Sequence, residues 1–209
     1  TLNMKTHRQS ATRAFTLIEL LITITIIAIL ASLTASGIIN AIDQANRLKV
    51  RAVSMELKGG IETYQTDYNR YPVMAGFSGA NGEDAPELLT DGNNSLVDTL
   101  MGIPPGSGGT ADLNPKRTQF VTFNPANNGR HGLVGATRPY KLADMYGQPY
   151  HILLDTNGDN QVKNPDVSNT DPKLSTGQAA HLATKVAVYS SGKDQIPSTG
   201  DDVTSWRPK

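Results

Sequence analysis

The sequence contains no cysteine at any of its 209 positions. Disulfide bonds, cysteine-ligated metal sites and thiol nucleophiles are therefore excluded, and the loops of this protein must be held by other means. An excess of charge of one sign is also missing, because 19 lysines and arginines balance 19 aspartates and glutamates. A neutral chain gives no electrostatic basis for binding nucleic acid, so we expect no nucleic-acid partner.

Common catalytic motifs are missing as well. There is no His-Glu-x-x-His zinc pair, no Gly-x-Ser-x-Gly nucleophile turn and no glycine-rich phosphate loop. The four histidines (His7, His131, His151 and His181) are scattered, with no spacing typical of metal ligands. We therefore predict no catalytic residues and a protein that is not an enzyme. The alternative left open is a membrane-anchored enzyme whose catalytic triad is assembled from residues distant in sequence.

One long apolar run lies near the amino end. Residues 20–39 include neither a charged residue nor a proline, and about 20 apolar residues span a bilayer as a helix. The preceding residues carry Lys5, Arg8 and Arg13 but no acid, which orients the run with its leader in the cytoplasm. Glu19 lies at the edge of the run, and an ionisable group in a membrane segment marks function by default.

The segment from Ala14 to Leu21 (AFTLIELL) resembles the class III signal of type IV pilins and type II secretion pseudopilins. The resemblance implies that residues 1–14 are a leader. Prepilin peptidase would remove it by cutting between Ala14 and Phe15 and would then methylate the new amino terminus of Phe15. Glu19 would then pair with the free amine of Phe15 on a neighbouring subunit and set the register of a helical homopolymer. An ordinary single-pass anchor with a stray acid is the alternative.

Apolar periodicity continues past residue 40 and predicts one helix from Phe15 to about Tyr68. Residues 15–40 would form its transmembrane or filament-core half, and residues 41–72 an amphipathic continuation packed on the head. The apolar positions at helical spacing in this second half are Ile42, Ala45, Leu48, Ala52, Met55, Ile61 and Tyr64. Adjacent Gly59 and Gly60 weaken a helix, and they predict either a close approach of the head or a bend.

The remainder of the chain predicts a small head. Residues 73–143 form a variable, loop-rich insertion, with short helices expected near 86–90 and 95–101 and a strand at 117–123. Residues 144–209 supply strands at 150–154 and 185–190 and end in a loop. The predicted fold class is α+β, with a long N-terminal helix, transmembrane in its first half, packed on a small antiparallel sheet as in pilins.

The stronger of two acidic clusters lies in this C-terminal loop. Adjacent Asp201 and Asp202, with Asp194 folded near them, repel one another unless a cation lies between them. The loop resembles the calcium loop of the major pseudopilins. By that resemblance Asp194, Asp201 and Asp202 supply side-chain oxygens to calcium, and Ser191 and Thr199 supply backbone carbonyls. A calcium clamp would replace the disulfide that this chain cannot form; a solvated acidic loop is the alternative.

The second acidic cluster partly matches the spacing of an EF-hand loop. Its candidate calcium ligands are Asp155, Asn157, Asp159, Gln161 and Asp166. Asn160 replaces the glycine at the sixth position, and asparagine adopts the same left-handed conformation. A hairpin turn built on Asn157 and Gly158 is the favoured alternative.

The resemblance implies a structural subunit of a type II secretion pseudopilus, a helical filament that helps to move folded proteins across the outer membrane. The implied partners are other copies of the chain, prepilin peptidase, an inner-membrane assembly platform and minor pseudopilins. The implied location is a single pass of the inner membrane with the head in the periplasm, and later the pseudopilus. A type IV pilus subunit for adhesion, motility or DNA uptake is the alternative; the calcium loop and the lack of cysteine favour secretion.

Overall fold

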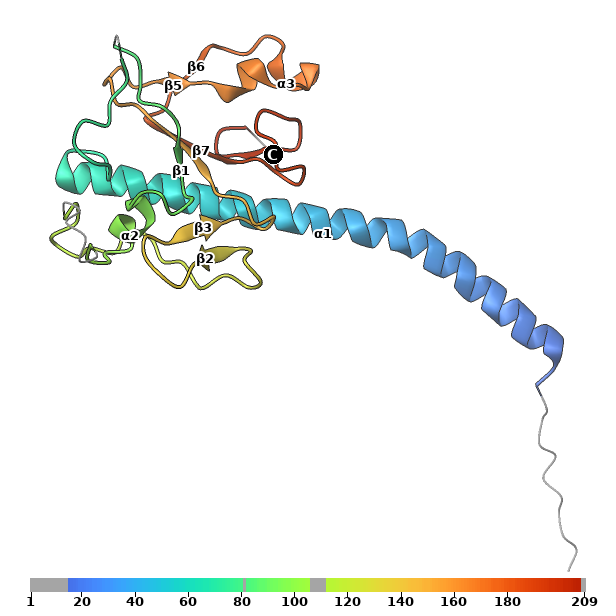
Figure 1. Ribbon diagram of the computed structural model, residues 1–209. Coiled ribbons are helices and arrows are strands. Elements are labelled where there is room, and N and C mark those ends of the chain that lie inside the picture. The colour runs from blue at the N-terminus through green and yellow to red at the C-terminus, as the bar shows by residue number, and fades with distance from the viewer. Residues whose placement is uncertain (1–14, 81, 106–111, 208–209) are drawn as a thin grey trace, which may run out of the picture. The chain divides into compact units, whose positions relative to one another are not determined.

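The computed structural model describes residues 15–80, 82–105 and 112–207, except for the side chains of residues 33–37. The chain divides into two compact units, an amino-terminal unit (Thr1–Gln44) and a head unit (Ala45–Lys209). Helix α1 (Leu17–Tyr68) runs through both units (Figure 1), which confirms the long predicted helix. It ends where Asn69 takes a left-handed conformation with φ of 52°, the usual way for a helix to stop.

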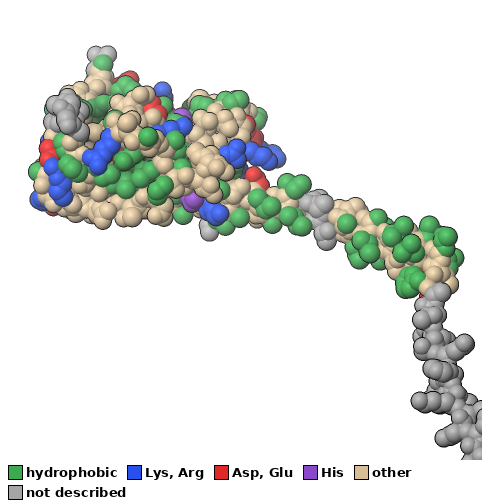
Figure 2. All heavy atoms as spheres, turned by 60° about the horizontal axis from the view of Figure 1, so that its bottom comes forward, with side chains coloured by type: hydrophobic (Ala, Val, Ile, Leu, Met, Phe, Trp, Pro, Cys, Tyr) green, Lys and Arg blue, Asp and Glu red, His purple; other side chains and the backbone are tan. Residues whose placement is uncertain are grey.

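From Leu17 onward the described part of the amino-terminal unit is helix, and most of its large side chains are apolar. Leu17 is 82% exposed and Ile27 is 64% exposed, and the other large apolar side chains of this unit are also more than half exposed. Figure 2 shows apolar side chains in green along this helix. Within the described residues, no helix has a stretch that is both long and apolar enough to cross a membrane.

An antiparallel sheet of four strands forms the centre of the head unit, in the order β1-β4-β7-β8. The strands are β1 (Leu88–Leu89), β4 (His151–Leu154), β7 (Val186–Ser190) and β8 (Val203–Thr204). Strand β4 pairs with β7 from His151 opposite Tyr189 to Leu154 opposite Val186. The strands predicted at 150–154 and 185–190, and the α+β class, are confirmed.

Two smaller antiparallel sheets and three short helices complete the described part of the head unit. One sheet pairs β2 (Gly132–Val134) with β3 (Lys141–Ala143), and the other pairs β5 (Val162–Lys163) with β6 (His181–Leu182). The helices are α2 (Leu96–Leu100), the 3₁₀ helix η1 (Pro165–Ser168) and α3 (Pro172–Ser175). Helix α2 confirms the prediction at 95–101.

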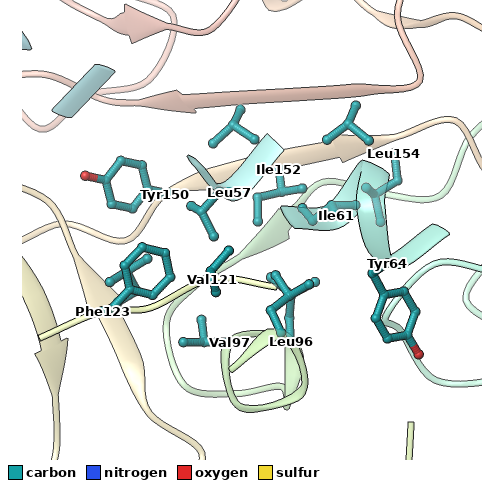
Figure 3. Close-up of a cluster of buried hydrophobic side chains, with 14 of the residues drawn as sticks. Leu57, Ile61, Tyr64, Leu96, Val97, Val121, Phe123, Tyr150, Ile152 and Leu154 are labelled. Carbon is teal, nitrogen blue, oxygen red and sulfur yellow. The ribbon is translucent and has the colours of Figure 1, made fainter. Parts of the chain in front are cut away.

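The core of the head lies between α1, the four-stranded sheet and α2 (Figure 3). Helix α1 buries Val50, Leu57, Ile61 and Tyr64 completely, and these positions recur at helical spacing on one face. The predicted head-facing face was therefore only partly right. Ile61 and Tyr64 are buried, but Leu48 and Met55 are 52% and 47% exposed, because the sheet packs on the neighbouring face of the helix.

Two predicted elements of the insertion are wrong. Residues 86–90 contain the edge strand β1 instead of a helix, because Leu88 and Leu89 pair with β4. Residues 117–123 form no strand; the backbone N–H of Phe120 donates to the carbonyl of Leu100, at the end of α2, over 2.8 Å. This segment makes the close approach that the glycines predict, since a Cβ on Gly60 would lie 2.4 Å from Val121 Cγ1.

Candidate functional site

Glu19 lies in the first turn of α1 and is hydrogen bonded locally. Its Oε2 accepts hydrogen bonds from the backbone N–H of Thr16 at 2.9 Å and from the Thr16 hydroxyl at 2.7 Å, and Thr16 Oγ1 accepts from Glu19 N–H at 3.3 Å. This reciprocal pattern is a capping box, which stabilises the first turn of a helix. The sequence signature of a capping box is present, because Thr16 is followed three residues later by Glu19. This signature would have predicted the helix start. Ala14 and the leader at 1–14 lie outside the described residues.

The C-terminal loop leaves β7 after Ser190 and returns at β8. Asp201 closes it, because its Oδ2 accepts hydrogen bonds from the backbone N–H groups of Lys193 at 2.6 Å and Asp194 at 3.0 Å. Its Oδ1 accepts a third from the Thr199 hydroxyl at 2.8 Å. Burial works to raise the pKa of Asp201, but these hydrogen bonds outweigh it and hold that pKa below its usual value.

Asp202 is held differently, although it is the next residue. Its carboxylate is 3% exposed, and Oδ2 accepts a hydrogen bond from the backbone N–H of Thr199 at 3.2 Å. Among the residues that the structure describes, Asp202 Oδ1 finds no hydrogen-bond partner. Burial raises the pKa of Asp202 to about 6, against the opposing effect of Arg207. A buried carboxylate oxygen without a donor is unfavourable unless a cation or a proton joins it.

Two of the remaining predicted calcium ligands accept hydrogen bonds from other residues of the head. Asp194 is exposed, and its Oδ1 accepts from the backbone N–H of Ile196 at 2.9 Å. The carbonyl of Thr199 accepts from the side-chain amide of Asn169 at 2.8 Å. Across the described part of the chain, no three side chains of the His, Asp and Glu types gather as a group that holds a metal. The described side chains therefore do not form a metal site by themselves, and a calcium ion here would need backbone carbonyls to complete its coordination shell.

The arrangement fits calcium in the chemistry of its donors. Asp194, Asp201 and Asp202 present only oxygens, which hard cations prefer, and each carboxylate oxygen can accept more than one interaction. Helix α1 also reaches the loop, since Arg47 Nη1 donates to the carbonyl of Asp201 over 3.0 Å. The unpartnered Oδ1 of Asp202 is a buried acceptor that a cation or a proton would satisfy.

The second acidic cluster forms a turn, but this turn is not the hairpin of the favoured alternative, because the flanking strands β4 and β5 lie in different sheets. Asp155 is buried, and its two oxygens accept from the backbone N–H groups of Gly158 at 2.7 Å and Asn160 at 2.9 Å. Asn160 has a φ of 63°, the left-handed conformation expected for it. Asn157 Oδ1 accepts from the N–H of Asp159, and Asp159 Oδ1 accepts from the N–H of Gln161.

Asp166 is engaged away from this turn. It forms an ion pair with Arg207, and its Oδ2 accepts from the indole N–H of Trp206 at 2.7 Å. The carboxylate at the twelfth position of the EF-hand pattern therefore anchors the C-terminal segment. The hydrogen bonds in this region are those of a turn, and the second calcium site stays a prediction.

The structure also joins residues that sequence reasoning did not connect. Glu87, His151 and Ser191 form a hydrogen-bonded chain at one end of the sheet. Asp144 is buried below the same end, where its Oδ2 accepts from the Ser190 hydroxyl at 2.5 Å. The partners in these contacts are 40 residues or more apart in the sequence. No local sequence pattern therefore predicts the contacts.

Comparison with known proteins identifies the chain's relatives. The prokaryotic N-terminal methylation motif matches residues 9–35. The type II secretion system core protein G of Klebsiella michiganensis is 37% identical over 199 residues, covering 95% of this chain and 96% of that protein. The protein of the same name from Klebsiella pneumoniae is 37% identical over 61 residues, covering 29% of this chain and 44% of that protein.

The core protein G of Escherichia coli K12 is 25% identical over 132 residues, covering 59% of this chain and 80% of that protein. No solved structure matches the chain. The methylation motif agrees with the helix start and with Glu19, and the first relative matches almost the whole of both chains. The chain therefore belongs to the family of the type II secretion system core protein G, the major pseudopilin.

Proposed function

We propose that this chain is a structural subunit of a type II secretion pseudopilus. Copies of the chain would polymerise into a helical filament that helps to move folded proteins across the outer membrane. The identity of 37% across nearly the whole chain to a type II secretion core protein supports this proposal over a type IV pilus subunit. Its role is structural, and the partners are other copies, prepilin peptidase, an inner-membrane assembly platform and minor pseudopilins.

The observation that carries the proposal is an apolar helical segment with an acid in its first turn. The described isoleucine and leucine side chains of the amino-terminal unit are exposed on all sides of the helix. Such a helix needs lipid or other apolar helices around it. Glu19 is the acid in that first turn. Before assembly, we infer a single pass of the inner membrane with the head in the periplasm. After cleavage, the amine of Phe15 on one copy would pair with Glu19 on another.

A second apolar surface supports packing between copies. In the head unit, Ala45, Leu48, Ala52 and Met55 follow one another at helical spacing on α1 and are exposed. We call these four residues the outer face of α1. The head's own core uses the neighbouring face, so the outer face is available to an adjacent subunit.

A comparison of strains tests the proposal. Deletion of the gene should leave normally secreted proteins inside the cell, and expression of the wild-type chain should restore their export. If the deletion instead removes long surface fibres and leaves protein export unchanged, the chain is a pilus subunit and the proposal is wrong. Mass spectrometry of the membrane-extracted chain should find a methylated amino terminus at Phe15; an intact leader in a cell with active peptidase would contradict processing.

We further propose that the C-terminal loop binds one calcium ion. The unpartnered, buried Oδ1 of Asp202 supports this site, with Asp194 and Asp201 as further carboxylates and Ser191 and Thr199 as carbonyl donors. When bound, the ion would neutralise adjacent carboxylates and close a loop that has no disulfide. The loop residues themselves fix the return of the chain, through the hydrogen bonds that Asp201 accepts.

Calcium titration of the full-length chain in detergent tests the site. Bound calcium is first removed from the protein with a chelator. Addition of calcium to the wild type should then give a heat of binding and, at millimolar calcium, raise the melting temperature, and Asp202→Asn should abolish both responses. Asp159→Asn is the matched control from the second acidic cluster and should behave as the wild type. An absence of heat and of a thermal shift in the wild type would remove the claim, and an effect of Asp159→Asn would move the site to the other loop.

A further inference from the structure

One end of the four-stranded sheet brings together an acid, an imidazole and a hydroxyl from three neighbouring strands. Glu87 directly precedes β1, His151 is the first residue of β4, and Ser191 directly follows β7. His151 Nδ1 bonds to Glu87 Oε1, and His151 Nε2 lies 2.8 Å from Ser191 Oγ. We call these three residues the relay.

Tyr189 contacts two members of the relay. The His151 ring stacks on Tyr189, its cross-strand partner, with centroids 4.4 Å apart and planes inclined by 20°. The Tyr189 hydroxyl donates to the second oxygen of Glu87 at 2.9 Å. Because a carboxylate only accepts hydrogen bonds, Nδ1 carries the proton toward Glu87, and in the neutral ring Nε2 accepts from the Ser191 hydroxyl. The hydroxyl of Ser191 is thereby fixed in one direction.

The same three residue types form the catalytic triad of many hydrolases, but this one is not built for catalysis. Ser191 is 2% exposed, so a substrate cannot reach its hydroxyl. The backbone N–H groups that follow it are also occupied. Gly192 N–H donates to Ser190 Oγ, and Lys193 N–H donates to Asp201, which leaves neither of them to stabilise an oxyanion.

Ser191 is instead the point at which the chain leaves the sheet for the C-terminal loop. The next residue, Gly192, has a φ of +70°, and a Cβ there would lie 2.5 Å from the carbonyl oxygen of Asp201. The start and the return of the loop are therefore in direct contact. Any rotation of the main chain at Ser191 displaces the contact with Asp201, so the loop geometry depends on how firmly Ser191 is held.

We propose that the relay is a positioning device for calcium binding, in which Glu87 and His151 hold the Ser191 main chain so that the loop is formed before the ion arrives. The inference rests on the calcium site proposed above and adds two residues, Glu87 and His151, that touch no ion. Substitution of residues that orient metal ligands without touching the metal commonly lowers metal affinity by about 10- to 100-fold.

The test measures the calcium affinity of the full-length chain in detergent by titration calorimetry. Each variant is titrated at a temperature below its own melting temperature in the presence of a chelator, so that it is folded before calcium is added. Ser191→Ala is the sharpest variant, because Ser191 would give the ion only its backbone carbonyl, which alanine keeps. We expect Ser191→Ala and Glu87→Leu to weaken calcium binding about tenfold. Glu87→Gln retains an acceptor for Nδ1–H and should bind calcium within about twofold of the wild type.

Two further variants separate positioning from general loss of stability. His151→Phe keeps a ring on Tyr189 but removes both hydrogen bonds, and it should weaken calcium binding as much as Ser191→Ala does. His181→Phe, on the exposed edge of β6, is the matched control and should change nothing.

The outcomes separate this proposal from the one beneath it. If the wild type binds calcium while Ser191→Ala and Glu87→Leu bind it equally well, the relay has no positioning role and the calcium site stands. If Glu87→Gln is as weak as Glu87→Leu, the effect is not that of the hydrogen bond and the relay is again rejected. If the wild type itself binds no calcium, the site and the relay's role both fall.

Discussion

Tyr150 is a fully buried residue whose hydroxyl finds no hydrogen-bond partner in the described part of the chain. Tyr150→Phe removes this desolvated group without leaving another unpaired, so the free energy of unfolding should stay the same or rise by up to about 1 kcal/mol. Tyr64→Phe is the matched control. Its hydroxyl donates to the carbonyl of Leu113 at 2.5 Å, and its loss should cost about 1 kcal/mol. Guanidinium unfolding followed by Trp206 fluorescence measures both; a larger loss for Tyr150→Phe than for Tyr64→Phe would contradict this assignment.

Asp98 gives the head a dependence of stability on pH. It lies in α2 and is 6% exposed, and burial raises its pKa from the ordinary value of 3.8, against a hydrogen bond from Tyr140 N–H and the charge of Arg138. A carboxyl with a raised pKa keeps its proton longer in the folded state. Its stabilising contribution is complete below the ordinary value and is lost as the pH rises through the raised pKa.

The variant Asp98→Asn isolates this effect. The free energy of unfolding of the wild type minus that of Asp98→Asn should fall as the pH rises from about 4 and then level off. Unfolding curves of both chains between about pH 3.5 and 7 measure the difference. A difference that rises with pH, or one that does not change, would show that Asp98 is not held in its neutral form by burial.

Single residues show where sequence reasoning reaches its limit. Glu19 was identified from its chemistry, because an acid beside a long apolar run is unusual wherever the fold places it. The environment of Asp202 was not predictable, since the fold gives adjacent Asp201 three hydrogen bonds but leaves Asp202 buried with an oxygen that accepts none in the described part of the chain. Glu87 and His151 were passed over, because they meet through strand pairing across 64 residues of sequence.

At the scale of elements, α1 contains a matched pair of glycines in different surroundings. Gly59 is open, with nothing within 4 Å of an added Cβ, whereas the Cβ of residue 60 would meet Val121 Cγ1 at 2.4 Å. Gly59→Ala should stabilise the head by about 1 kcal/mol through helix propensity. Gly60→Ala gains the same propensity but overpacks the core, so it should destabilise the head by about 1 to 2 kcal/mol. Equal effects of the two substitutions in unfolding experiments would contradict the close packing of residues 120–121 on α1.

The success of element prediction follows from how each element is specified. Helix α1 and strands β4 and β7 carry long or regular apolar patterns, which persist whatever the tertiary surroundings. The two-residue strand β1 exists only because β4 pairs with it. Residues 117–123 pair with no strand and begin with Arg117 in a left-handed conformation, so composition misassigned both segments. The choice of which face of α1 meets the sheet was also set by tertiary packing, which left Leu48 and Met55 outside.

At the scale of the whole molecule, the outer face of α1 predicts a phenotype confined to assembly. Leu48→Glu and Met55→Glu place charges on exposed positions, so they should leave the free energy of unfolding of the subunit within about 0.5 kcal/mol of the wild type. In the filament the same charges would be buried without partners and should reduce filament yield strongly. Gln178→Glu, on the exposed surface of the head, is the control. Normal filaments from both α1 variants would show that the outer face takes no part in assembly.

Removal of the charge of Glu19 tests whether its pairing with the amine of Phe15 is needed for filament assembly. Glu19→Gln keeps an oxygen that can accept the hydrogen bonds of Thr16, so it removes the charge while preserving the helix cap. Glu83→Gln in the exposed loop of the head is the control. Mass spectrometry should first establish that each variant begins at Phe15, and filament yield and protein export are then measured in the deletion strain. We predict that Glu19→Gln lowers filament yield at least about tenfold, because it removes the charge that would pair with the amine of Phe15, and that it stops export, while Glu83→Gln does neither. Filaments of Glu19→Gln with wild-type yield and subunit spacing would contradict the pairing on which assembly is proposed to depend.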